Sequence, residues 1–161
     1  MQEKPREFPG VDRKARMQLP SKGLPLRPAA ERILDFNEVV LPLDPERAVY
    51  EASRCLHCPD VAPCQKACPA HNDISMALWL IEQERFIEAA QMYRQTSSMP
   101  EVCGRVCPHE QLCQGACVRA KRGEPVLTGA LEAFVADYQR RASGVEVPVG
   151  ASSGRRVAII G

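Results

Sequence analysis

The sequence has few aromatic residues and no long apolar run. Phe, Trp and Tyr make up 5% of the 161 residues, so the core that this chain can build is thin. Nowhere do about eighteen apolar residues follow one another, as a membrane-spanning helix would need. The first residues, MQEKPREFPG, also lack the apolar stretch of a signal peptide. We therefore expect a cytoplasmic protein with no membrane association.

The sequence also lacks an excess of positive or negative charge. Lysine and arginine number 21 and Asp and Glu number 20, which gives a net charge of +1 and argues against a nucleic-acid partner. The first 22 residues are locally basic, and we interpret them as a solvated tail. The period-two alternation of β-strands is missing before the last seven residues, so the fold class is predicted to be all-α.

Proline and helix signals divide the chain. Residues 1–43 are rich in proline and predict an extended arm, within which only residues 29–40 favour a short helix or turn. At Asp44 the sequence has the pattern of a helix start, with Pro45 at the first helical position. From this point residues 44–142 are predicted to form a helical domain.

Apolar residues at helical spacing predict three more helices within this domain. Two of them are expected within residues 71–100, with apolar positions from Ile74 to Ile81 and from Phe86 to Tyr93 and a join near Glu84, and the third is expected over residues 128–142. Met76, Trp79 and Met92 are explained by core packing alone. The predicted domain is followed by a linker over residues 143–154.

The sequence is rich in cysteine. Its eight cysteines lie in two stretches of four, CLHCPDVAPCQKACP from Cys55 and CGRVCPHEQLCQGAC from Cys103. Disulfides are rare in the reducing cytoplasm, so clustered cysteines there indicate a metal centre. Zinc ribbons pair two CxxC hairpins, and only one CxxC is present. The nearest pattern is that of bacterial ferredoxins, in which three cysteines hold one [4Fe-4S] cluster and a fourth, followed by proline, holds the other.

Applied here, that rule predicts two [4Fe-4S] clusters that exchange their fourth ligands. Cys68 precedes Pro69 and would turn to the second cluster, while Cys117 would return to the first by the approximate symmetry of the second stretch. The first cluster would then be held by Cys55, Cys58, Cys64 and Cys117, and the second by Cys68, Cys107, Cys113 and an eighth ligand. By count alone the eighth ligand is Cys103, which could share one helical face with Cys107. The neighbouring histidines, His57, His71 and His109, are weaker candidates, because histidine is exceptional in such clusters.

At these motifs the chain resembles a known family. RCLHC, PCQKACPAHNDI, PEVCGRVCP, LCQGACV and TGALEAF are similar to the N-terminal iron-sulfur domain of the glutamate synthase small subunit. That domain is shared with dihydropyrimidine dehydrogenase and with the large subunit of the NADH-dependent ferredoxin:NADP oxidoreductase. The likeness covers roughly residues 30–161, with one departure in the five residues between Cys58 and Cys64, where the family often has fewer.

The resemblance implies a helical ferredoxin-like domain with two [4Fe-4S] clusters and the exchanged ligands. It also implies that an acid or amide on the last helix, here Glu132 in TGALEAF, is the fourth ligand of the second cluster. Cys103 would then be a buried thiol that binds no metal. A carboxylate in place of a thiolate changes the charge and the potential of a cluster.

The last seven residues, RRVAIIG (155–161), have the pattern of the first strand of a dinucleotide-binding fold. Gly161 would be the first glycine of its GxGxxG motif and would bind the cofactor. Together with the cysteine domain, this predicts an electron-transfer domain cut from a larger flavoprotein. In that parent, electrons from NADPH would enter an FAD held by the FAD/NAD(P)-binding domain of the same chain. They would then cross the clusters to a second catalytic subunit, as in glutamate synthase.

Two other interpretations stay open. The cysteines could bind zinc and only stabilise a protein-interaction module. The CxxC could instead act as the dithiol of a small redox regulator, although eight cysteines are many for one switch. No catalytic acid, base or nucleophile is evident, so the domain by itself is not expected to be an enzyme.

Overall fold

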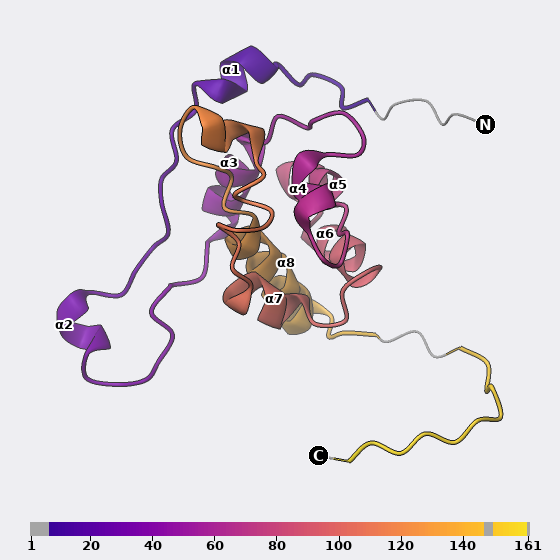
Figure 1. The fold of residues 1–161 in the computed structure, drawn as a ribbon. Helices are drawn as coiled ribbons and strands as arrows, with labels where there is room; N and C mark the ends of the chain where they lie inside the picture. The colour runs from indigo at the N-terminus through magenta and orange to yellow at the C-terminus, as the bar shows by residue number, and fades with distance from the viewer. Residues whose placement is uncertain (1–6, 147–149, 161) are drawn as a thin grey trace.

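A computed structural model describes residues 7–146 and 150–160, and the middle of the chain forms a bundle of helices (Figure 1). Among these residues the single strand-like pairing is a bridge between Leu26 and Val40, so the predicted all-α class is confirmed. In chain order the elements are α1 (Arg13–Met17), α2 (Ala29–Arg32), α3 (Pro45–Ser53), α4 (Pro63–Ala67), α5 (Ile74–Glu82), α6 (Phe86–Arg94), α7 (Pro100–Val106), the 3-10 helix η1 (Val118–Lys121) and α8 (Thr128–Ala142).

The predicted helix starts are explained by local capping. The Asp44 side chain accepts a hydrogen bond from the Arg47 backbone N–H at 2.7 Å, which confirms the expected start of α3. Asp73 caps α5 in the same way. The three helices expected from apolar spacing are α5, α6 and α8, and the join expected near Glu84 lies between the end of α5 at Glu82 and the start of α6 at Phe86. Four short elements, α1, α4, α7 and η1, were not predicted.

The core lies between α3, α5, α6 and α8, with α7 packed against the outer side of α8. Small buried residues such as Ala48, Ala77 and Ala90 let the helices approach closely. Leucine, isoleucine and valine fill the spaces between them, and an edge-to-face contact joins Phe86 to Phe134. Because the bundle is small, few aromatic side chains are needed to fill its core.

α7 and α8 meet at a glycine. A β-carbon on Gly104 would lie 2.6 Å from the Ala133 backbone nitrogen and 2.8 Å from the Gly129 carbonyl oxygen. Both atoms belong to the backbone of α8, so no side-chain rotation could relieve the overlap. The absence of a side chain at Gly104 therefore sets the distance between the helix that carries Cys103 and the helix that carries Glu132.

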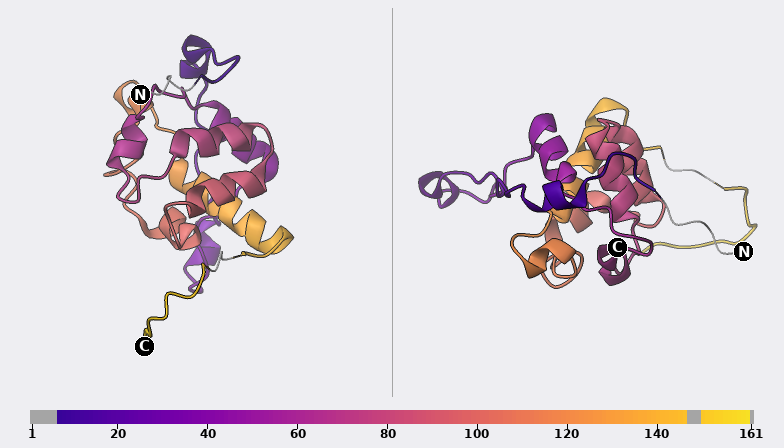
Figure 2. Two further views of the ribbon diagram at one scale, coloured as in Figure 1. Left: turned by 90° about the vertical axis from the view of Figure 1, so that its right-hand side faces the viewer. Right: turned by 90° about the horizontal axis from the view of Figure 1, so that it is seen from above.

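The N-terminal arm is not a solvated tail, and that interpretation was wrong for its described part. α1 lies across the bundle, whereas α2 projects to one side on a separate lobe (Figures 1 and 2). Arg13 and Arg16 of α1 donate hydrogen bonds to backbone carbonyls of residues 55–57. The basic residues of this stretch are thus used to fix the arm on the domain.

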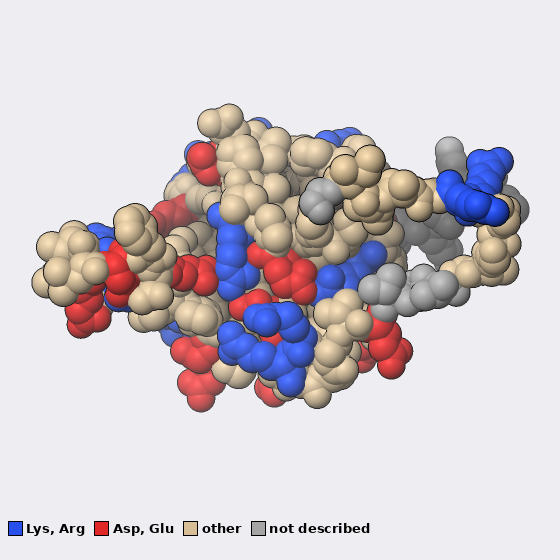
Figure 3. All heavy atoms as spheres, turned by 90° about the horizontal axis from the view of Figure 1, so that it is seen from below, with Lys and Arg blue, Asp and Glu red and all other residues tan. Residues whose placement is uncertain are grey.

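Several charged side chains on the surface form ion pairs. Asp137 on α8 accepts from Arg105 of α7 at 2.7 Å, and Arg105 also pairs with Glu38 of the arm. On the face seen from below, blue and red side chains alternate across the middle of the molecule (Figure 3). Acidic and basic side chains therefore lie close together on this face.

Residues 150–160 have neither helix nor strand, and Val157, Ile159 and Ile160 are exposed. The strand expected at residues 155–161 stays a prediction, because a strand forms only when a neighbouring strand pairs with it. Gly161 lies outside the described residues. No helix in the described part of the chain is long and apolar enough to cross a membrane.

Candidate metal centre

Two cavities in the domain are lined by cysteines, and each takes sulfurs from both sequence stretches. The first lies against the CxxC loop and α4, with apolar walls that include Leu56, Ala62 and Val126. Its cysteines are Cys55, Cys58, Cys64 and Cys117. Cys117 is thus brought to the three cysteines of the other stretch.

The second cavity lies between the turn after α4, the end of α7 and the start of α8. Its walls include Ile74, Tyr93 and Leu112. Its thiols and carboxyl are Cys68, Cys103, Cys107, Cys113 and Glu132. The exchange of Cys68 and Cys117 between the stretches is the grouping that the sequence predicts, and both candidates for the eighth ligand line this cavity.

Cys55 and Cys117 come together through a buried ion pair that the sequence analysis missed. Glu51 and Arg54, at the end of α3, are buried and paired with each other. Arg54 also donates to the carbonyls of Glu124 and Pro125, and Glu51 accepts from the Leu127 N–H at 2.9 Å. The segment after Cys117 is thereby held against the segment before Cys55. The signal was an acid and an arginine three residues apart on an otherwise apolar helix face.

Cys68 leaves the first cavity because α4 ends there. Its backbone is extended (φ −78°, ψ 122°), and the next turn is closed by a hydrogen bond from the His71 N–H to the Cys68 carbonyl. Beyond it, the buried Asn72 accepts from the Thr96 hydroxyl at 2.6 Å. This anchor fixes the turn on the side of the second cavity.

Cys103 lies within α7, whereas Cys107 lies just after the end of this helix. α7 ends at Val106, and Cys107 is extended (φ −63°, ψ 142°), because Pro108 follows it and disfavours a helical residue at that position. Cys103 is half-buried, not fully buried as the resemblance implies, and its sulfur lies 3.7 Å from the Ser97 hydroxyl. Even so, both sulfurs belong to the second cavity.

Glu132 is buried on α8, facing the second cavity. Burial, assisted by the nearby Glu101, raises the pKa of its carboxyl to about 7. Its described hydrogen bond is a long one, 3.5 Å from the Asn72 Nδ2 donor. One long hydrogen bond offsets little of the free-energy cost of burying this carboxyl. The carboxyl is therefore available to bind a positively charged ligand. Asn72 was not predicted as part of the site.

The eight cysteines are free thiols. Burial raises the pKa of Cys64 to about 12 and that of Cys107 to about 11, and it raises the pKa of Cys55 well above its usual range. The two cavities are neighbours at the start of α5, where Ser75 lines the first and Ile74 lines the second. Since thiolates are the ligands of soft metals, a metal that binds here must displace these protons.

The three histidines differ in position. His57 does not line either cavity: its Nε2 lies 2.7 Å from Glu82 Oε1 and its Nδ1 lies 3.3 Å from the Ser75 hydroxyl. His71 belongs to the turn after Cys68 and is exposed. His109 lines the second cavity, and burial lowers its pKa.

The donor sets fit iron-sulfur clusters. Four thiols surround the first cavity, and thiols with one carboxyl surround the second. Within the described residues, no three His, Cys, Asp or Glu side chains converge closely enough to hold one metal ion. The Tyr93 hydroxyl and His109 Nε2 are buried with no hydrogen-bond partner among the described residues, and both residues line the second cavity. Sulfides or ligating sulfurs there would supply the acceptors that these donors lack.

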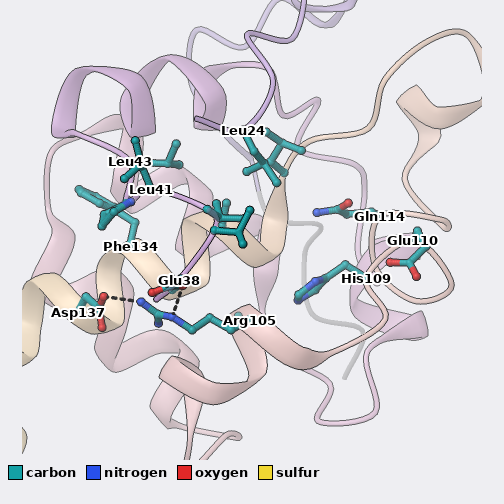
Figure 4. Close-up of a pocket in the computed structure, with 17 residues that line it drawn as sticks. Leu24, Glu38, Leu41, Leu43, Arg105, His109, Glu110, Gln114, Phe134 and Asp137 are labelled. Carbon is teal, nitrogen blue, oxygen red and sulfur yellow. Dashed lines mark hydrogen bonds and ion pairs between the residues drawn. The ribbon is translucent and has the colours of Figure 1, made fainter. Parts of the chain in front are cut away.

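A separate groove of about 480 Å³ lies between the arm and α7 and α8 (Figure 4). Leu24, Leu41 and Phe134 give it apolar walls, and no cysteine lines it. At one end, Arg105 points to both Glu38 and Asp137, as the dashed lines of Figure 4 show. These three charged groups are paired with one another, and no three His, Cys, Asp or Glu side chains of the described residues come together in the groove to hold a metal ion.

The chain matches the family model described as dihydropyrimidine dehydrogenase domain II, 4Fe-4S cluster, over residues 32–144. It is 43% identical over 115 residues to the NAD-dependent dihydropyrimidine dehydrogenase subunit PreT of Escherichia coli, a match that covers 71% of this chain and 27% of that protein. Two glutamate synthase [NADPH] small chains are also similar. The one from Escherichia coli is 36% identical over 143 residues (85% of this chain, 29% of that protein). The one from Halomonas elongata is 40% identical over 111 residues (69% and 23%). The chain therefore spans less than a third of the length of these relatives.

Proposed function

The chain belongs to the family of dihydropyrimidine dehydrogenase domain II iron-sulfur domains, and we propose that it transfers electrons through two [4Fe-4S] clusters. The observation that carries the proposal is the sharing of each cavity by both cysteine stretches. Within the described residues, no three His, Cys, Asp or Glu side chains come close enough together to hold a single ion, as a zinc site would need. The family match supports iron-sulfur chemistry in place of the zinc-stabilised interaction module.

The proposed ligands follow the lining of the cavities. The first cluster is held by Cys55, Cys58, Cys64 and Cys117, and the second by Cys68, Cys107, Cys113 and Glu132. When bound, such clusters accept and release single electrons at potentials set by their surroundings. The protein contributes the apolar walls that limit water and the ligand exchange that keeps the two cavities adjacent.

The rest of the electron path belongs to the proposed parent protein. The relatives are named as an NAD-dependent dihydropyrimidine dehydrogenase subunit and as glutamate synthase [NADPH] small chains, and the matched regions make up 23% to 29% of their lengths. By analogy, we place an FAD- and NAD(P)-binding domain after residue 154, with Gly161 at its phosphate-binding turn, and NADPH as the donor. A second catalytic subunit receives the electrons and performs the substrate chemistry. Free thiols fit a cytoplasmic location.

The test is the metal content of protein purified without oxygen. We expect about eight irons and about eight acid-labile sulfides per chain, with the broad visible absorption of iron-sulfur clusters, because two [4Fe-4S] clusters contain that many atoms. The same sample gives a zinc determination as an internal comparison. Stoichiometric zinc without sulfide would contradict the proposal and favour the interaction module.

A further inference from the structure

The N-terminal arm holds three successive carbonyls of the CxxC loop. Arg13 donates through Nε to the Leu56 carbonyl and through Nη2 to the His57 carbonyl, both at 2.9 Å. Arg16 donates to the Cys55 carbonyl at 2.9 Å. All three carbonyls therefore face the arm.

The orientation of a carbonyl fixes that of the amide N–H in the same peptide. In a trans peptide the two groups point in opposite directions. When the carbonyls of residues 55, 56 and 57 face the arm, the N–H groups of the three following residues face away from it. Among them, the His57 N–H points to a cysteine sulfur, at 3.4 Å from that of Cys55. Successive N–H groups arranged in this way form a concave anion site, a feature of many iron-sulfur proteins.

His57 has the backbone conformation that such a site requires. Its φ is +43°, in the left-handed region that residues other than glycine seldom adopt. The ring is fully buried, stacks on Phe8 of the arm at 4.4 Å between centroids, and lies within hydrogen-bond distance of Glu82. Glu82 is also paired with Arg16 through both oxygens, at 2.8 and 2.7 Å. The arm thus stabilises the loop through the ring as well as through the carbonyls.

The arm is itself fixed by the domain. The buried Arg119, two residues after Cys117, donates to the carbonyls of Arg16 and Leu19. Arg54, next to Cys55, donates to the Leu19 carbonyl at 3.3 Å. Two segments that carry ligands of the first cavity therefore bind the arm, and the arm in turn binds the CxxC loop. α1 cannot shift without disturbing that loop.

We propose that Arg13 and Arg16 are positioning residues that set the reduction potential of the first cluster by aiming the amides of residues 56–58 at its sulfurs. This inference rests on the proposed function and adds the part that the arm plays in it. Hydrogen bonds to the sulfurs stabilise the reduced, more negative form of a cluster, and so do nearby positive charges. Loss of the arm contacts should therefore make the potential of the first cluster more negative and leave that of the second unchanged.

The test compares variants of the whole chain in a redox titration followed by electron paramagnetic resonance under anaerobic conditions. The signal of the first cluster is identified as the one that Cys58→Ser removes. Arg13→Ala should move the midpoint potential of that signal to a more negative value with the iron content unchanged, because Arg13 is an exposed residue whose loss leaves the core intact. Arg13→Lys keeps the charge but cannot bridge two carbonyls, so it should shift the potential in the same direction.

Arg27→Ala is the matched control, because it removes an arginine of the same arm that pairs with Asp35 on the exposed lobe. It should change neither potential. Amide hydrogen exchange gives a second readout that needs no cluster: exchange at residues 56–58 should be faster in Arg13→Ala than in Arg27→Ala. Equal shifts of both clusters, a wild-type potential in Arg13→Lys, or unchanged potentials and exchange in Arg13→Ala would each overturn the inference. The proposed function would still stand as long as both clusters are present.

Discussion

At the scale of single residues, the cysteine count and the family resemblance select different residues as the eighth cluster ligand. Counting cysteines selects Cys103, whereas the resemblance selects Glu132, and both line the second cavity. Glu132 is buried with one long hydrogen bond, and Cys103 is half-buried beside Ser97. A buried carboxyl without a strong partner is costly, which favours Glu132 as the residue that meets a cation.

We therefore expect Cys103→Ala to keep both clusters and to cost about 1 to 2 kcal/mol in the free energy of unfolding, as most point mutations do. Glu132→Ala should lose or convert the second cluster. Glu132→Cys should keep it at a more negative potential, because a thiolate donates more charge to iron than a carboxylate. Iron analysis and redox titration measure these results. If Cys103→Ala, and not Glu132→Ala, lost iron, the assignment would be reversed.

The sequence predicted the cysteines of this site but not the other residues around them. The cysteine spacing indicated which sulfurs share a cavity, because ligand patterns of iron-sulfur proteins are local in sequence. Asn72 and Tyr93 were missed, since their place at the second cavity depends on how α5 and α6 pack. The pair of Glu51 and Arg54 was missed for a similar reason, because buried charges are recognised only when their distant backbone partners are known.

At the scale of elements, the contact of α7 with α8 positions the second cavity. Gly104→Ala should lower the free energy of unfolding by about 1 to 3 kcal/mol, because the added methyl group overlaps backbone atoms of α8. Gly123→Ala is the control, since no atom lies within 4 Å of a β-carbon there. Denaturant unfolding of both variants measures the difference. Equal stabilities would show that the two helices do not meet as described.

The longer helices were predictable and the short ones were not. α5, α6 and α8 have apolar residues at helical spacing, and α3 has a strong cap at Asp44. α1, α4, α7 and η1 span between four and seven residues, which is too short for a periodic pattern to be recognised. The basic arm was misread as solvated because the partners of its arginines are backbone carbonyls and the distant Glu82, which the local sequence of the arm does not reveal.

At the scale of the whole molecule, the clusters should contribute to folding. The core is small, and each cavity joins segments that are distant in sequence. Removing the metal leaves buried thiols around a space, so part of the binding free energy is folding free energy. The apo protein should melt at a lower temperature than the loaded protein in calorimetry or circular dichroism. Reconstitution with iron and sulfide should restore the original melting temperature, and equal melting temperatures would contradict this account.

The ligand exchange is the central claim, and the most direct test is electron paramagnetic resonance of three reduced variants, Cys58→Ser, Cys68→Ser and Cys117→Ser. Cys117→Ser should alter the same cluster signal as Cys58→Ser, although 59 positions separate the two residues in the sequence (117 − 58). Cys68→Ser should alter the other signal, although it follows Cys58 by ten positions (68 − 58). If Cys68→Ser and Cys58→Ser altered one signal and Cys117→Ser the other, each stretch would hold its own cluster, and the account would be contradicted.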